Sequence, residues 1–260
     1  MRIAMTDWFD QVYNDPLYLK FYEGSDSGLA IAEARSAIAL LDPDPDTYWL
    51  DLCCGFGRHA EQFAQAGYRT TGVDRSGMML SRARQRACAA DLPIDYVQAD
   101  LRQLPFSETF DRASCMFDSF GYFGSDIDHL EALLSICSAL KPHGRLLIEL
   151  SNRERILSSW NPESSESYPP YQLQKRRCFD LAAGRVVCDI AITGPEGTHS
   201  WTLDCRMFAA SELRNLLEQA GFDQIQFYGD WDASPLSPQS RAMIVLARKC
   251  TFADLTPLFD

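Results

Sequence analysis

Three acidic residues have the spacing of groups that could bind a ligand together. Asp51, Asp74 and Asp100 each lie at or near the end of a short apolar run that has the length of a β-strand. The carboxyl ends of parallel strands meet at one edge of a sheet, and open α/β sheets bind their ligands at that edge. We therefore expect these carboxylates to converge on one ligand.

Two glycines follow the first of these acids. Gly55 and Gly57 separate an apolar run from a helical pattern that continues to Gly67. Glycine permits positive φ and has no Cβ, so a ligand could lie against the backbone there and meet the N–H groups that open the helix. A tight turn without any ligand would have the same residues. Asp74, however, lies about 20 residues further on, where an acid would reach a pair of ribose hydroxyls. The spacing indicates a cofactor that contains a nucleoside.

Aromatic residues are dense ahead of the first predicted strand, over residues 1–27. The hydroxyls of Tyr13 and Tyr22 could bond a ligand, and the ring faces could hold a cation. The segment could be an aromatic flap over a pocket, which we expect, or a hydrophobic clasp packed on the domain.

The composition limits the class of protein. The chain has 260 residues, 46% of them hydrophobic, which suffices for one large core. Its net charge of -12 argues against attachment to a nucleic-acid backbone. The nine cysteines contain no Cys-x-x-Cys pair, which indicates reduced thiols, no metal site and a cytoplasmic protein. No signal-like segment and no run of 18 apolar residues occurs, so no membrane association is expected.

The elements that must position the acids alternate between strand and helix. This alternation predicts a parallel sheet with helices on both faces. Strands are predicted over 48–53, 69–73, 94–98, 110–117 and 146–150, and helices over 28–41, 58–66, 76–90 and 127–140.

The composition changes after Trp160. Residues 161–170 are predicted to be an acidic connector, followed by strands over 171–180, 185–194 and 198–208. The alternation of apolar and polar residues in these strands is typical of an antiparallel meander with one solvent-exposed face. We expect an inserted β cover over 160–208 that lies across the active site, although an inert subdomain would have the same pattern. The chain then returns to the α/β pattern, with a helix capped by Ser211 and strands over 224–228 and 242–248.

Six segments carry a resemblance to the class I methyltransferases that use S-adenosylmethionine. They are YWLDLCCGFGRHA, GVDRSGMML, DYVQADLRQLPF, FDSFGYF, LKPHGRLLIELSN and ELRNLLEQAGF, spread over residues 29 to 249. The SFGYF motif and the meander are similar to those of a group of bacterial small-molecule methyltransferases. The resemblance implies a single domain over 1–260 with a Rossmann-like sheet of seven strands, mostly parallel, whose last strand is antiparallel. The family's glycine motif has a glycine where this chain has Cys53.

The resemblance also implies which residues hold the cofactor. Asp74 would accept both ribose hydroxyls and Asp100 the adenine amino group, while Asp51 would orient the glycine loop or bond the cofactor's amine. Gly55 would lie against the methionine part, and Phe117 beneath the sulfonium. The residues expected to bind S-adenosylmethionine are Tyr13, Tyr22, Asp51, Cys53, Gly55, Gly57, Asp74, Arg75, Met79, Asp100, Leu101 and Phe117.

A sulfonium is already an activated methyl donor, so such an enzyme chiefly holds donor and acceptor in line and excludes water. A general base matters for a hydroxyl acceptor and matters little for an amine that arrives unprotonated. The candidate bases or substrate anchors are Asp118, Tyr122 and His199, and each could equally be structural. We expect methyl transfer to an oxygen or nitrogen of a small molecule, by a monomer or homodimer.

Two alternatives remain open from the sequence. Gly55, Gly57 and Ala60 fit the loose G-x-G-x-x-A pattern of a nicotinamide-dependent oxidoreductase, with Asp74 downstream. Against this, the turn begins late in the chain, and a dehydrogenase has no comparable use for Asp100. The other alternative is a non-catalytic protein that binds S-adenosylmethionine as a regulatory subunit.

Overall fold

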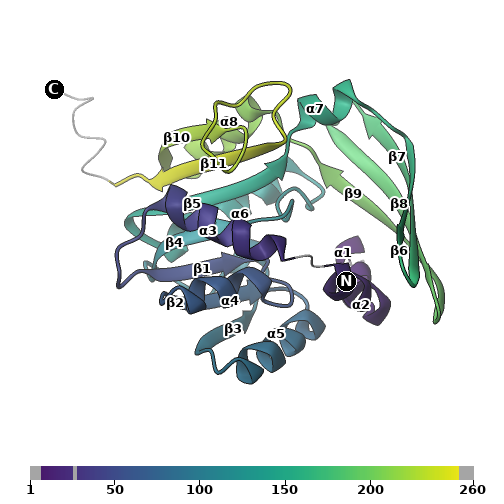
Figure 1. The fold of residues 1–260 in the computed structure, drawn as a ribbon. Coiled ribbons are helices and arrows are strands. Elements are labelled where there is room, and N and C mark those ends of the chain that lie inside the picture. The colour runs from purple at the N-terminus through teal and green to yellow at the C-terminus, as the bar shows by residue number, and fades with distance from the viewer. Residues whose placement is uncertain (1–6, 26–27, 252–260) are drawn as a thin grey trace, which may run out of the picture.

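The main sheet has seven strands in the order β10-β11-β5-β4-β1-β2-β3. The structure is a computed structural model, and it describes residues 7–25 and 28–251. Strands β1 to β5 pair in parallel, and β11 runs antiparallel to both of its neighbours, as predicted (Figure 1). The strands are β1 (Tyr48–Leu52), β2 (Arg69–Asp74), β3 (Ile94–Gln98), β4 (Phe110–Cys115), β5 (Leu140–Ser151), β10 (Phe222–Tyr228) and β11 (Ala242–Lys249).

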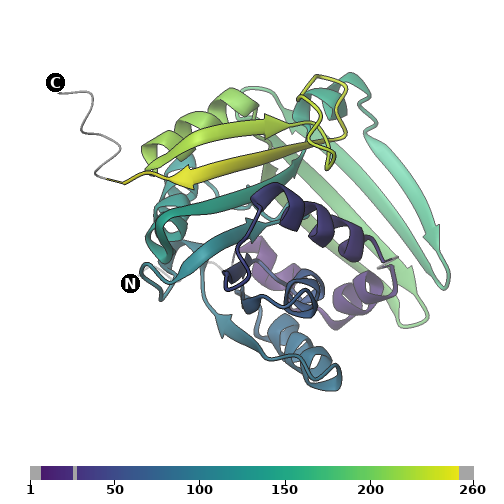
Figure 2. The same ribbon diagram turned by 60° about the vertical axis from the view of Figure 1, so that its left-hand side comes forward.

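Helices cover both faces of this sheet because its central strands are apolar on both sides. In β1, Trp49 packs with residues of α3 and α4, whereas Leu50 packs with residues of α6 and α8. Figure 2 shows α3 lying across the first of these faces. The helices of this layered domain are α3 (Leu29–Leu41), α4 (Arg58–Gln65), α5 (Gly77–Ala89), α6 (Asp126–Ala139), α7 (Arg153–Ser158) and α8 (Ala210–Gln219), with a 3₁₀ turn η1 (Leu101–Gln103).

A second, antiparallel sheet stands beside the carboxyl ends of the main strands (Figure 1). It consists of β6 (Glu163–Tyr168), β7 (Tyr171–Asp180), β8 (Arg185–Gly194) and β9 (Gly197–Arg206). The last three match the predicted meander. The predicted connector is wrong over β6, because this edge strand, ESSESY, has no apolar alternation by which it could be recognised.

Two N-terminal helices, α1 (Trp8–Val12) and α2 (Pro16–Ser25), lie between the two sheets (Figure 1). Val12 and Phe21 belong to one buried cluster with Ile190 and Ile192 of β8. The helices therefore join the cover sheet to the rest of the molecule through apolar contacts. Residues 1–6 and 26–27 of the predicted flap lie outside the described residues.

Three predicted boundaries are wrong. Strand β4 ends at Cys115, because the next turn holds non-glycine residues at positive φ. Strand β5 begins at Leu140, since a register shift against β4 accommodates Pro142 within it. Helix α8 is preceded by Ala209 at its N-cap rather than by Ser211.

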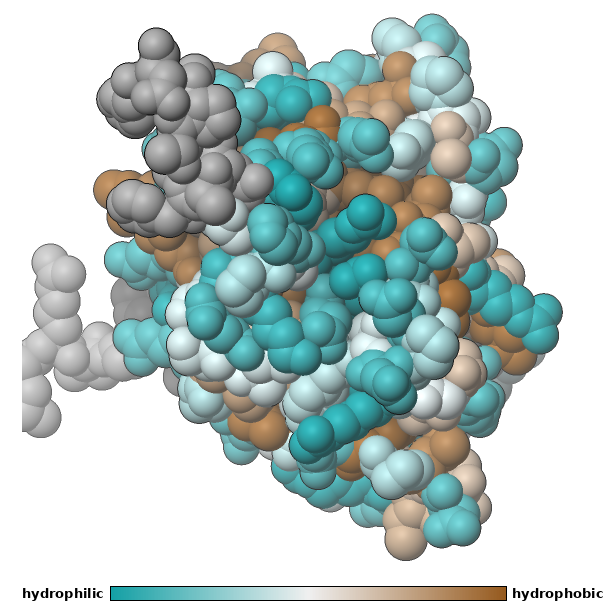
Figure 3. Space-filling view, turned by 90° about the vertical axis from the view of Figure 1, so that its left-hand side faces the viewer, coloured by the Kyte–Doolittle hydropathy of each residue, from teal (hydrophilic) through white to brown (hydrophobic). Residues whose placement is uncertain are grey.

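The face seen in Figure 3 is the side at which the parallel strands begin. Hydrophilic residues are spread over it among separate hydrophobic patches. Among residues 7–25 and 28–251, no helix is long and apolar enough to cross a membrane.

Candidate active site

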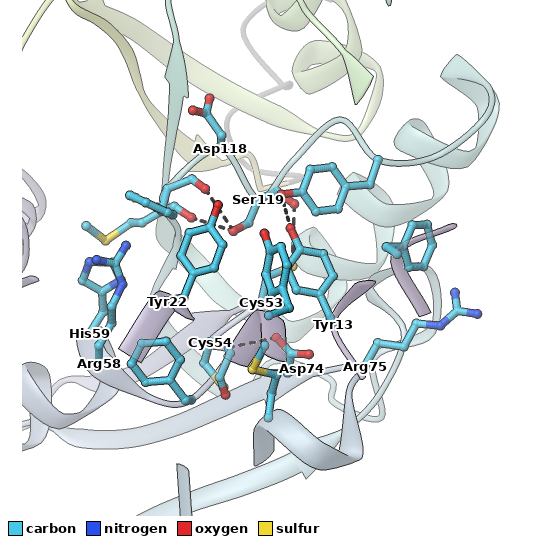
Figure 4. A pocket seen from close by; sticks show the side chains of 18 of the residues that line it. Tyr13, Tyr22, Cys53, Cys54, Arg58, His59, Asp74, Arg75, Asp118 and Ser119 are labelled. Atoms are coloured by element: carbon cyan, nitrogen blue, oxygen red, sulfur yellow. Dashed lines mark hydrogen bonds between the residues drawn. The ribbon is translucent and has the colours of Figure 1, made fainter. Parts of the chain in front are cut away.

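A cavity of about 610 Å³ lies at the carboxyl ends of the central strands, and residues of α1, α2 and the second sheet also line it. Figure 4 shows side chains of its lining. Most of the predicted site residues line it, from elements far apart in the sequence. The lining residues among them are Tyr13, Tyr22, Cys53, Gly55, Asp74, Arg75, Met79, Asp100, Leu101, Phe117, Asp118 and Tyr122. Asp51, Gly57 and His199 do not line this cavity.

The two glycines of the turn after β1 have different roles. Gly55 has φ +54°, and a Cβ there would meet nothing within 4 Å, so its backbone is open to the cavity. Gly57 has φ +85°, but a Cβ there would lie 2.4 Å from the Tyr96 hydroxyl. Gly57 is therefore required for packing, whereas Gly55 leaves room for a ligand. Cys53 also has a positive φ, of 54°, a conformation that costs a non-glycine residue roughly 1–2 kcal/mol.

Asp74 ties the end of β2 to this turn. Its carboxylate accepts hydrogen bonds from the backbone N–H groups of Gly55 and Ser76, each at 2.8 Å. Burial raises the pKa of Asp74, while these N–H donors act in the opposite direction. The carboxylate thus holds the glycine turn and also faces the cavity (Figure 4).

Asp100 is held by two arginines. Its carboxylate accepts from Arg102 at 2.8 and 3.0 Å and from Arg75 at 2.9 Å. Partial burial acts to raise the pKa of Asp100, but the bonds from Arg102 hold it below its ordinary value. Arg75 also pairs with Asp7 and Asp10 at 2.9 and 2.8 Å, so it connects the strand tips to the N-terminal segment.

Asp51 lies behind the turn rather than in the cavity. Its side chain is 1% exposed, and one carboxylate oxygen, Oδ2, has no hydrogen-bond partner in the described part of the chain. Burial raises the pKa of Asp51 to about 7. Two of the three predicted acids therefore share one cavity, and the third lies beneath its floor.

Aromatic residues close the cavity on the side of the N-terminal helices. The hydroxyls of Tyr13 and Tyr122 lie 2.8 Å apart, and their rings stack at 5.9 Å. Burial raises the pKa of both phenols well above the usual value. Neither tyrosine is therefore a phenolate near neutral pH, which argues against Tyr122 as a general base.

Asp118 and Glu149 form a pair of acids beside the end of β4. The Asp118 carboxylate accepts the backbone N–H of Ser151 and contacts its hydroxyl at 2.6 Å, while Glu149 accepts the N–H of Phe117 at 2.5 Å. Burial, and then the neighbouring Asp118, raise the pKa of Glu149 to about 8. Burial raises the pKa of Asp118 as well. The pair therefore retains a proton near neutral pH.

Phe117 and Asp118 both have positive φ, 61° and 55°. Two successive non-glycine residues in the left-handed region are strained, and such strain concentrates at functional sites. The turn directs Asp118 toward β5, and it leaves Phe117, which is 47% exposed, in the lining of the cavity.

Sequence reasoning missed three residues of this region. Glu149 lies inside a buried strand, and its only signal was an acid within the run LLIEL. Arg58 and His59 line the cavity from the first turn of α4, immediately after the glycine motif. The Arg58 guanidinium lies 4.1 Å from the Phe117 ring centre, and His59 Nε2 lies 2.8 Å from Glu33.

His199 lies on β9 but away from the cavity. Its Nδ1 is 3.0 Å from Asp15, beside the start of α2. The predicted cover therefore presents His199 to the N-terminal helices rather than to the site.

The residues of this cavity fit a cofactor that carries an adenosine. The open backbone at Gly55 leaves space for a ligand, Asp74 offers a carboxylate beside it, and Met79 supplies a polarizable apolar wall. A volume of about 610 Å³ is in the usual range for small-molecule and cofactor sites.

Known proteins share both the sequence and the fold. Residues 50–144 match the family model described as a methyltransferase domain. The glycine/sarcosine N-methyltransferase of Aphanothece halophytica is 30% identical over 189 residues, which cover 70% of this chain and 68% of that protein. The glycine/sarcosine N-methyltransferase of Halorhodospira halochloris is 26% identical over 238 residues, covering 90% and 87%.

The fold is that of a solved S-adenosylmethionine-dependent methyltransferase from Clostridium acetobutylicum. The two superpose with a TM-score of 0.78 at 17% identity, over 90% of this chain and 100% of the other. Taken with the matched domain and the glycine turn, these likenesses identify the chain as a member of the class I S-adenosylmethionine-dependent methyltransferases.

Proposed function

We propose that this enzyme methylates the nitrogen of a small amine. The observation that carries the proposal is the acid pair, Asp118 and Glu149, at the edge of a cavity lined by aromatic rings. An amine reaches such a site chiefly as an ammonium ion, which aromatic faces and a carboxylate attract. The two relatives named above as glycine/sarcosine N-methyltransferases support nitrogen as the acceptor atom.

The acid pair would serve the proton balance of the reaction. An ammonium has no lone pair, so it must lose one proton before its nitrogen can form a bond to carbon. We propose that Asp118, whose pKa is raised by burial, accepts this proton, and that Glu149 stays protonated beside it. Each turnover then passes that proton to solvent, and the product leaves as the N-methylated ammonium.

Other residues of the cavity would hold the cofactor. We propose that Asp74 receives the ribose hydroxyls, that Gly55 lies against the methionine part, and that Asp100 and Leu101 face the adenine. S-adenosylmethionine supplies a methyl group already activated on a sulfonium. The protein's own contribution is then to align the acceptor and to exclude water.

The domain organisation has a matching role. We propose that the whole chain is one methyltransferase domain, with α1 and α2 as its flap and the sheet of β6 to β9 as its cover. The apolar cluster shared by Phe21 and Ile190 supports this, because it unites the two parts over the cavity.

A hydroxyl acceptor is the second candidate. His59 lines the cavity, and its Nε2 lies 2.8 Å from Glu33, an arrangement that can orient an imidazole as a general base. A hydroxyl requires such a base more than an amine does.

A panel assay separates these candidates. The full chain is incubated with S-adenosylmethionine and small amines, amino acids, phenols and carboxylic acids, and methylated products are identified by mass and by the position of the new methyl group. N-methylated products would support the proposal, whereas O-methylated products alone would replace it with the second candidate. Cofactor binding in a calorimeter without any methylation would favour a regulatory protein.

A further inference from the structure

The inner face of β7 carries two cations. Its residues alternate, so Leu173 is buried and Lys175 and Arg177 point the same way, while Arg176 points outward with a side chain 76% exposed. Lys175 and Arg177 thus lie on one face of β7, and Arg176 lies on the other.

The pairing of the strands shows what lies beside these cations. Lys175 is opposite Ser164 of β6 and Ile190 of β8, and Arg177 is opposite Cys188, which is in turn opposite Leu203 of β9. Lys175 and Leu203 both line the cavity. The cover therefore presents an apolar surface to the cavity with a basic corner at its β7 side.

This basic corner is only partly neutralised. Lys175 Nζ lies 3.3 Å from Glu166 Oε1, and Arg177 Nη2 lies 2.6 Å from the Ser164 hydroxyl. Arg177 Nε is buried and has no hydrogen-bond partner within the described residues. Two cations thus lie near one carboxylate, Glu166, so the corner keeps a net positive charge, and Lys175 is the cation of the two that lines the cavity.

An acid stands on the opposite wall of the same cavity. Asp118 follows the end of β4 and lines the cavity, and its charge adds to the rise in the pKa of Cys205 on β9, after the larger effects of burial and of Asp204. The cavity therefore has an acid, Asp118, on its strand side and a cation, Lys175, on its cover side.

We infer that the methyl acceptor is zwitterionic, with a carboxylate or phosphate that Lys175 binds while its amine faces Asp118. This inference rests on the proposed N-methyltransferase function. A simple amine would have only the acid wall to bind, and it would be repelled by the cations of the cover. An acceptor with both charges would be oriented by both walls, with its amine directed to the strand tips.

Matched probes test the inference. The full chain, saturated with S-adenosylhomocysteine, is titrated calorimetrically with β-alanine and β-alaninamide, and with phosphoethanolamine and ethanolamine. We expect the anionic member of at least one pair to bind about tenfold or more tightly than its neutral partner. The carboxylate and phosphate pairs tell which anion is preferred.

Variants assign the preference to the basic corner. Lys175→Gln should reduce it to about threefold or less, and Lys175→Arg should restore it. Arg176→Gln removes the same charge from the outer face of the same strand, so it should leave the preference unchanged. Affinity for S-adenosylmethionine should be unaffected in all three. Should Lys175→Gln fail to fold, Lys175→Met gives the same test, because it removes the charge and keeps the apolar stem.

The outcomes separate this inference from the proposed function. If neutral amines bind as tightly as the anionic probes and are methylated in the presence of S-adenosylmethionine, the proposed function stands and the zwitterionic acceptor is rejected. The same rejection follows if Lys175→Gln behaves like Arg176→Gln. If no probe of either kind binds or is methylated although S-adenosylmethionine binds, both proposals fail.

Discussion

Replacing Asp74 should separate the cofactor contact from the support of the glycine turn. In Asp74→Ala the N–H groups of Gly55 and Ser76 lose an acceptor that lies 2.8 Å from each. A bound cofactor would lose the acceptor proposed for its ribose hydroxyls. A hydrogen bond to a charged group contributes roughly 1.5–3 kcal/mol, so losing one to the ligand should weaken binding about 10- to 150-fold.

The stability of the free protein should change less than the affinity. Burial raises the pKa of Asp74, which means that keeping this carboxylate charged is costly in the absence of ligand. Its removal relieves that cost while breaking two hydrogen bonds, and the two effects oppose one another. Asp74→Asn keeps the shape but can accept fewer N–H bonds, so we expect a similar loss of affinity.

The assay is calorimetric titration with S-adenosylhomocysteine and with its 2′-deoxy analogue. Wild type should discriminate strongly between the two, and the Asp74 variants should not. Asp95→Ala removes an exposed carboxylate from β3 and serves as the control. Equal affinity in wild type and Asp74→Ala, or discrimination that survives the substitution, would refute the assignment.

Three further substitutions test other parts of the site. The folded-state pKa of Glu149 is raised to about 8, so its stabilising contribution is present at low pH and is lost as pH rises through 8. Chemical unfolding should therefore show the stability of wild type falling relative to Glu149→Gln between about pH 5 and 9. Parallel curves of stability against pH would contradict the raised pKa. Arg75→Gln breaks partly exposed contacts with Asp7, Asp10 and Asp100, so it should cost only about 1 kcal/mol of stability. It should nevertheless speed the release of S-adenosylhomocysteine several-fold in stopped flow. An unchanged release rate would show that Arg75 does not help to hold the N-terminal helices over the cavity. Cys53→Gly removes a left-handed non-glycine residue, so it should leave cofactor affinity intact and keep or raise the melting temperature, whereas a loss of affinity would show that the thiol itself matters.

The strand tips and the glycine turn could be predicted because local spacing encodes them. An acid after an apolar run and glycines before a helical pattern need no knowledge of distant residues, and both Asp74 and Gly55 line the cavity. The cofactor class followed from the same spacing together with the resemblance of six segments, and the family assignment selects S-adenosylmethionine over a nicotinamide cofactor.

Residues whose role depends on tertiary contacts could not be predicted. Glu149 matters because β4 and β5 bring it to the N–H of Phe117, across 32 positions of the chain. The alternation of β9 predicts that His199 points to the inner side of the second sheet. The strand register, however, places His199 opposite Ile192, near α2, and not beside Leu203, which lines the cavity. Helices α1 and α2 are short, and their stability comes from packing rather than from a local pattern.

The packing at Tyr96 has a consequence for how glycine motifs are interpreted. Its ring fills the space that a Cβ at Gly57 or Gly72 would enter, at 2.4 and 2.7 Å, so two separate glycines accommodate one aromatic residue of β3. A methyl group at either position would push β3 outward, and with it the adjoining Asp100, without touching any bound molecule. Of the two glycines in the turn after β1, Gly57 is thus required by close packing against Tyr96 and not by a ligand. Natural variants with a smaller residue at position 96 could therefore carry a larger residue at position 57.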